Sequence, residues 1–123
     1  VYGAPTPGCA GASSLGANSE ARVGNRRFGY VMGNTPPSAA GLIGLALGSG
    51  SLPVFGITVL VDPATVAVIN IGSDAFGTAV HPFGLPPSPG LVGIAVYAQA
   101  VWMDPCGSES LSSSAGLSFT VRP

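Results

Sequence analysis

Glycine and proline interrupt this chain so often that long helices have no room to form. The 123 residues include 19 glycines and 12 prolines, which lie between short apolar runs rather than in one tract. Proline removes a backbone donor and glycine costs conformational entropy inside a helix, so both residues favour turns. The sequence therefore predicts an all-β chain in which short strands are joined by turns.

About seven apolar runs fit short strands, at a spacing typical of a sandwich. The last run is the clearest, because Leu117, Phe119 and Val121 alternate with polar residues and so give one core face. We expect a single domain, an antiparallel β-sandwich of immunoglobulin-like or jelly-roll-like type with about seven to eight strands. The predicted strands are 27–32, 41–47, 55–61, 66–71, 77–82, 91–102 and 117–122.

The first 18 residues differ from the rest because they are mostly Gly, Ala, Ser and Pro, with few apolar anchors. We expect residues 1–18 to form an extended N-terminal segment before a β-sandwich domain at 19–123. Two interpretations are open: a surface coil fastened to its own domain, or an arm that reaches a neighbouring copy. The candidate arm residues are Val1, Tyr2, Pro5, Pro7 and Leu15.

Charge is scarce in this sequence. Charged residues make up 7% of the chain and hydrophobic residues 46%, against about 25% charged residues in a typical soluble domain. There is no lysine and the net charge is −1, so a basic surface that binds a phosphate backbone is absent from the composition. The longest nearly apolar run, 91–103, is shorter than the roughly 20 residues that span a bilayer. We expect neither a nucleic-acid partner nor a membrane span.

Cys9 and Cys106 lie near opposite ends of the sequence, each in a Gly-containing turn. This wide spacing differs from that of a CxxC redox or metal pair and predicts a disulfide. Because disulfides persist in oxidising compartments, we expect an extracellular or cell-surface protein. No leader sequence is evident, and we expect a signal peptide to have been removed already.

Few residues are suited to catalysis or metal binding. His81 is the only histidine, and we interpret it as structural; Asp62 and Asp104 each precede proline, where a carboxylate caps a turn. No nucleophile elbow, phosphate loop, zinc-protease motif or calcium loop occurs, and the serine-rich stretch 108–114 is predicted to be a polar loop. We expect no catalytic residue, metal or cofactor, and hence no enzyme, with a glycosidase-type carboxylate pair as an open alternative.

The aromatic residues with candidate roles in recognition are Tyr30, Tyr97 and Trp102. Together with Gln99, Tyr97 and Trp102 suit a platform on which a sugar ring stacks, because exposed aromatics with amide neighbours bind carbohydrate. The alternative places these rings in the core or in an interface.

An ordered set of motifs covers most of the chain: YGAPTPGCAG at 2–11, NTPP at 34–37, GLALG at 44–48 and LVGIAVYAQA at 91–100. The set resembles an uncharacterised domain family of secreted planctomycete and myxobacterial proteins. A YGxGC.G opening, an NxP turn, an LxLG strand and a GxxxYxQ strand ending near Asp-Pro recur in that family. The resemblance implies export and a β-sandwich, and it brings no catalytic residues. This chain departs from the family pattern by lacking a cysteine at 55–60 and having Cys106 instead.

These features predict a non-catalytic extracellular structural protein, a self-associating subunit of a bacterial filament or surface assembly. Low charge removes a usual protection against edge-to-edge association. A free strand edge also accepts an extended segment through main-chain hydrogen bonds, so we expect strand exchange through the N-terminal segment. The expected partners are identical copies in a homo-oligomer or polymer. The alternative is a secreted carbohydrate-binding or cell-surface-attachment module, in which Tyr30, Tyr97 or Trp102 stacks on an extracellular glycan.

Overall fold

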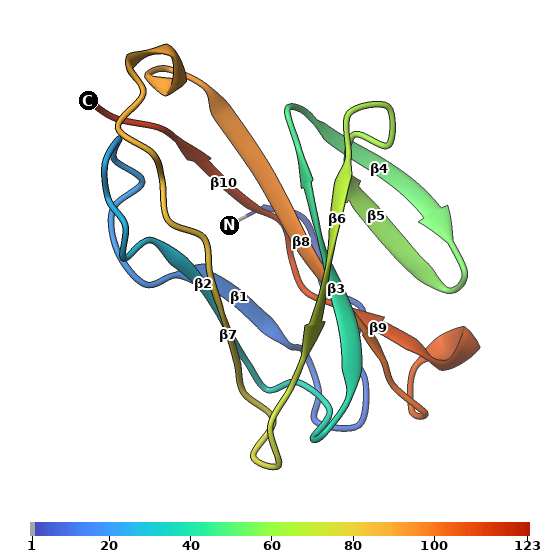
Figure 1. Ribbon diagram of the computed structural model, residues 1–123. Helices are drawn as coiled ribbons and strands as arrows, with labels where there is room; N and C mark the ends of the chain where they lie inside the picture. Colours follow the sequence, from blue (N-terminus) through green and yellow to red (C-terminus); the bar gives the residue numbers. More distant parts are fainter. Residues whose placement is uncertain (1) are drawn as a thin grey trace.

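The computed structural model describes residues 2–123, apart from the side chain of Ser108, and these residues form two facing antiparallel sheets and a separate hairpin (Figure 1). The first sheet has the order β1-β2-β7, with β1 at Ser14–Ala17, β2 at Gly29–Gly33 and β7 at Ala79–Pro82. The second sheet has the order β10-β8-β3-β6, with β10 at Leu117–Thr120, β8 at Ala95–Met103, β3 at Ala40–Ala46 and β6 at Ala67–Gly72. The remaining elements are β9 (Leu111–Ser113), which pairs with β8, the hairpin of β4 (Ser49–Val54) and β5 (Ile57–Val61), and the short 3-10 helices η1 (Pro89–Leu91) and η2 (Ser108–Ser110).

The predicted all-β class is confirmed. All neighbouring strands are antiparallel, and each predicted run overlaps a strand. The order β1-β2-β7 against β10-β8-β3-β6 corresponds to strands A-B-E against G-F-C-C′ of an immunoglobulin-like sandwich. The β4–β5 hairpin is then an insertion between the third and fourth strands of that pattern. It lies on the side of the second sheet that faces away from the first (Figure 1).

Three strands were not predicted. β1 and β4 consist largely of small and polar residues, and β9 lies inside the stretch predicted to be a polar loop. That loop prediction is wrong for 111–113, because these residues pair with the end of β8. Ser112, Ser113 and Ser114 are buried, and the Ser114 hydroxyl accepts a hydrogen bond from the Ala100 N–H at 3.0 Å. Local composition does not reveal this burial, which depends on a distant strand.

The core lies between the two sheets and is centred on large side chains with no exposed surface, including Phe28, Tyr30 and Trp102. Burying each such side chain contributes about 1.5–3 kcal/mol to stability. Gly41 pairs with Trp102 across β3 and β8, and a Cβ at Gly41 would lie 2.6 Å from the indole ring. The predicted alternation of the last strand is confirmed, since Leu117 and Phe119 pack against this core.

The N-terminal segment is bonded to its own domain. Tyr2 and Gly116 exchange two backbone hydrogen bonds of 2.8 and 2.7 Å, and Thr6 and Ser113 exchange two of 3.0 Å. Farther along, β1 is an edge strand of the first sheet. The predicted boundary at residue 18 therefore falls inside the sandwich rather than between an arm and a domain.

Candidate association surfaces

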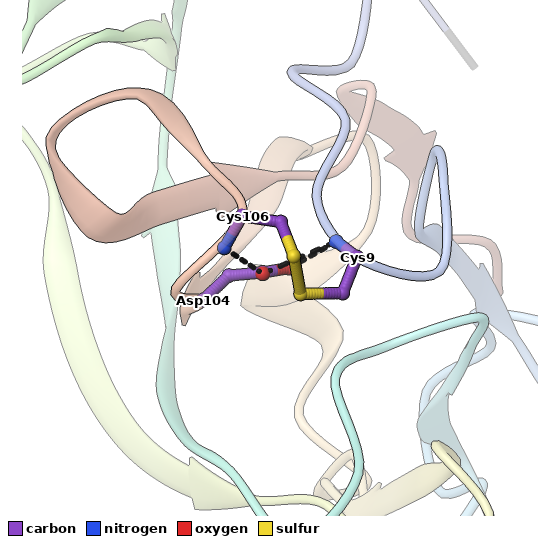
Figure 2. The surroundings of a disulfide bond; sticks show 3 residues. All are labelled: Cys9, Asp104 and Cys106. Atoms are coloured by element: carbon purple, nitrogen blue, oxygen red, sulfur yellow. Dashed lines mark hydrogen bonds between the residues drawn. A yellow bond between two sulfur atoms is a disulfide. The ribbon is translucent and has the colours of Figure 1, made fainter.

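A disulfide between Cys9 and Cys106 ties the N-terminal segment to the loop after β8, as Figure 2 shows. The Asp104 carboxylate is only 2% exposed and accepts hydrogen bonds from the backbone N–H groups of Cys9 and Cys106 at 3.1–3.3 Å. The predicted disulfide is confirmed, and Asp104 caps its turn as predicted. Gly8 lies against the same carboxylate, where a Cβ would overlap Oδ2. This packing leaves residues 2–9 fixed at both ends.

Tyr2 anchors the start of the segment. Its hydroxyl donates a hydrogen bond to the Leu60 carbonyl at 2.6 Å, and its ring meets that of Tyr97 edge to face, with 5.9 Å between the centroids. Burial and the neighbouring Tyr97 raise the pKa of the Tyr2 hydroxyl. The segment therefore contacts the β4–β5 hairpin as well as the second sheet.

The other candidate arm residues are spread along the segment. Pro5 is partly buried, Pro7 is exposed, and Leu15 is a buried core residue of β1. Val1 lies outside the described residues. Leu15 is thus unavailable for exchange without opening the core, and the structure does not bring these residues together as one surface.

Two of the three candidate recognition aromatics are inaccessible. Tyr30 and Trp102 have no exposed surface, because even-numbered positions of β2 and β8 face the core, so the prediction of a stacking role is wrong for both. The Tyr30 hydroxyl has no hydrogen-bond partner among the described residues, and burial raises its pKa. Tyr97 is partly buried against Tyr2.

Gln99 anchors the hairpin to the second sheet. Its side chain is 2% exposed and points to the outer face of β8, the face away from β1-β2-β7. Oε1 accepts a hydrogen bond from the Leu60 N–H at 2.9 Å, while Nε2 donates to the carbonyls of Thr58 and Ser114 at 2.9 and 3.2 Å. The sugar platform expected from the sequence includes Gln99, but the buried amide has no surface to offer a ligand. A lone amide in an apolar strand is better interpreted as a buried group with backbone partners.

The hairpin covers only one end of this outer face. Beneath it lies a hollow of about 180 Å³ lined by Val66 and Val68, and a second hollow of about 230 Å³ continues along Leu42 and Met103. Val68 is 57% exposed and Met103 64% exposed. An uncovered, nearly continuous apolar strip therefore runs across the outer face of β3, β6 and the end of β8.

Strand β6 forms the free edge of the second sheet beside this strip, since it pairs only with β3. The Ser73 N–H donates to the Ala39 carbonyl, so by antiparallel alternation the odd-numbered residues of β6 bond to β3. The N–H and C=O groups of Val68 and Asn70 then point outward. Ala67–Gly72 contains no charged residue and no proline, and no register shift interrupts its pairing.

The other edges carry the features that usually prevent strand addition. β4 has an irregular register and Pro53, while β1 and β7 have four residues each, with Pro82 at the end of β7. The edge formed by β9 and β10 is covered in part by Tyr2 and Thr6. The outer edge of β5 is covered by the side chains of Gln99 and Tyr2, which bond Thr58 and Leu60. Among residues 2–123, β6 is therefore the least protected edge.

One cluster of potential metal ligands occurs in the described part of the chain. The one group of His, Cys, Asp and Glu side chains close enough to share a metal ion is Cys9, Asp104 and Cys106, and its two sulfur atoms are bonded to each other. His81 lies partly buried on β7. Hydrogen bonds from the Thr78 hydroxyl and backbone lower the pKa of Asp74, which caps the β6–β7 turn.

No protein-family model, curated protein or solved structure matches this chain. Neither of the two short helices within residues 2–123 has the length and apolar character needed to cross a membrane. The disulfide is typical of proteins that reside in an oxidising compartment.

Proposed function

We propose that the protein is a non-catalytic extracellular structural subunit that self-associates into a bacterial filament or surface assembly. The observation that carries this proposal is the free β6 edge beside an uncovered apolar strip. The scarcity of charge supports it, because few charges are available to repel a second copy. The disulfide and the resemblance to a secreted family support export.

In this proposal two copies of β6 pair antiparallel about a twofold axis. The outward N–H and C=O groups of Val68 and Asn70 would supply the hydrogen bonds, as in other cases of strand addition. This contact replaces exchange of the N-terminal segment, which is held by the disulfide and by its own backbone pairing. The glycan-binding alternative has less support, since Tyr97 is the one candidate ring with accessible surface.

Light scattering and electron microscopy of the oxidised protein over a range of concentrations test the proposal. We expect the mean mass to rise with concentration. Val68→Lys should lower the mass at each concentration, because it places charge on the β6 edge. Val80→Lys is the matched control, since Val80 is similarly exposed, at 63%, on the other sheet. A wild-type monomer at every concentration, or a Val68→Lys variant that associates as the wild type does, would overturn the proposal.

A further inference from the structure

Pairing of β6 about a twofold axis closes at a dimer, whereas a filament needs a second contact between unlike surfaces. The sandwich has two unlike ends. β2 and β8 both run from one end to the other: Gly29 and Ala95 begin them, and Gly33 and Met103 end them beside the loops near the disulfide. We call these the arginine end and the disulfide end.

The arginine end carries every arginine of the chain. Arg22 and Arg122 form a backbone bridge, and both contact Glu20, at 3.0 and 3.3 Å. Arg26 and Arg27 are exposed and form no ion pair among the described residues. Because the chain contains no lysine, its basic side chains are all confined to this end.

A proline-rich loop, 82–90, is part of the same end and lies next to the C-terminus in Figure 1. The Leu85 N–H donates to the Asn25 carbonyl at 2.9 Å, and the Gly24 N–H donates to the Pro86 carbonyl at 3.1 Å. Pro86 and Pro87 are exposed. Proline has no N–H, so such rings can be buried in an apolar site without leaving a donor unpaired.

The disulfide end has a hollow, with acidic residues in the segments beside it. A hollow of about 570 Å³ opens there, lined chiefly by Pro36, Pro37, Ala40, Met103 and Pro105. Two exposed acidic residues belong to the segments that border this hollow. On one side Ser38, a lining residue, donates its N–H to the backbone carbonyl of Asp74 at 2.8 Å. On the other side Glu109 lies in η2, in the loop that follows Pro105.

We propose that these ends dock head to tail. The loop 82–90 of one copy enters the hollow of the next, and Arg26 and Arg27 face the carboxylates of Asp74 and Glu109. The contact joins unlike surfaces and leaves one of each free at the ends of the chain of subunits, so it extends without closing. This inference rests on the proposed self-association. The head-to-tail contact is the second contact that would join β6-paired dimers into a filament.

The test uses two variants built on Val68→Lys, so that β6 pairing is already weakened. The loop variant carries Arg26→Glu and Arg27→Glu, and the hollow variant carries Ala40→Arg, at an exposed position of β3 that lines the hollow. Sedimentation velocity should find each variant monomeric alone. An equimolar mixture should contain a species of twice the monomer mass and nothing larger, because the two variants together have one intact contact.

Conservative substitutions at the same positions distinguish an effect of charge or size on docking from a loss of folding. Arg26→Lys with Arg27→Lys, and separately Ala40→Ser, should associate as the Val68→Lys parent does. If Ala40→Arg fails to fold by circular dichroism, Glu109→Arg takes its place. A Val68→Lys parent that is already fully monomeric, or variants whose association equals that of the parent, would overturn head-to-tail docking while leaving the proposed function standing. A wild-type monomer would remove both.

Discussion

Tyr30 places a hydroxyl in the core with no hydrogen-bond partner among the described residues. An unpaired buried hydroxyl costs about 1–3 kcal/mol, so we expect Tyr30→Phe to keep the stability of the wild type or to raise it by about 1 kcal/mol. The ring would retain its contact with Phe28, at 5.6 Å between centroids. Tyr2→Phe is the control, because it removes the bond to Leu60 and should lower stability. Guanidinium unfolding measures both variants, and a larger loss in Tyr30→Phe than in Tyr2→Phe would contradict the expectation.

The same residue gives a pH dependence. Burial raises the pKa of Tyr30 above the value of about 10 that tyrosine has in an unfolded chain. The neutral form is therefore favoured in the fold, so this contribution to stability is complete below about pH 10 and is lost as the pH rises further. We expect the unfolding free energy to fall as the pH rises above about 10, with a shallower fall in Tyr30→Phe. Equal slopes in the two proteins would show that Tyr30 does not contribute.

Asp104 and Asp62 offer a matched pair, because each caps an Asp-Pro turn. Asp62 accepts one hydrogen bond, from the Ala64 N–H at 3.0 Å, in a less buried setting. Asp104 is buried and bonds the N–H groups of both cysteines. We expect Asp104→Asn to cost about 2 kcal/mol, and Asp62→Asn to cost less than half of that. Thermal unfolding of both variants measures the two losses of stability. Equal losses would mean that the buried Asp104 carboxylate stabilises the fold no more than an ordinary turn cap does.

Among elements, the β4–β5 hairpin is bonded to the second sheet through the side chain of Gln99, and Tyr2 adds a further bond to Leu60. Gln99→Leu would leave the Leu60 N–H and the Thr58 carbonyl without their partner, although leucine fills a similar volume. We expect a loss of about 2 kcal/mol and faster hydrogen exchange in β5 than in β3. Exchange that quickens equally in both strands would instead indicate global destabilisation without local release of the hairpin.

Strand β6 permits a test of which groups face the free edge. Proline at an edge position is tolerated where the missing N–H would point to solvent. Asn70→Pro should therefore keep the fold, while Ile69→Pro should remove a hydrogen bond to β3 and cost about 1–3 kcal/mol. Circular dichroism and chemical unfolding compare the two. If the two variants lose equal stability, or if Asn70→Pro is the worse, the assignment of outward N–H groups is incorrect.

An element can be predicted from the sequence where its pattern of polar and apolar residues shows which side is buried. Alternation at Leu117 and Phe119 gives both the strand and its inner face, and the separation of Cys9 from Cys106 predicts their bond. The predicted strand 91–102 is apolar apart from Gln99, so its sequence does not tell whether Tyr97 or Trp102 faces the core. β9 is polar, and only its pairing with β8 makes it a strand.

At the scale of the whole molecule, the composition predicts an all-β chain with little charge but not the distribution of that charge. Arg22 and Arg122 are 100 positions apart in the numbering and meet only because the loop between β1 and β2 lies beside the segment that follows β10. The free edge likewise depends on strand order, which places β6 next to β3 alone. Both candidate contacts are therefore products of topology, and no single motif encodes either of them.

The disulfide links the stability of the molecule to its association. Cys9 and Cys106 are 97 residues apart, so replacing both with serine should lower stability by roughly 4 to 5 kcal/mol in the chain-entropy model. The replacement would also loosen the segment that covers the β9–β10 edge, where Tyr2 and Thr6 pair with Gly116 and Ser113. We expect faster hydrogen exchange at Gly116 and Ser113 and disordered aggregates, because a second long edge becomes free.

Adding Val68→Lys to the double serine variant distinguishes the two edges. If aggregation arises at β9–β10, the lysine on β6 should not prevent it, whereas it should prevent aggregation that arises at β6. Unchanged exchange at Gly116 and Ser113 after loss of the disulfide would mean that backbone pairing alone holds the segment. In that case the disulfide between Cys9 and Cys106 would stabilise the fold but would not be needed to keep the β9–β10 edge covered.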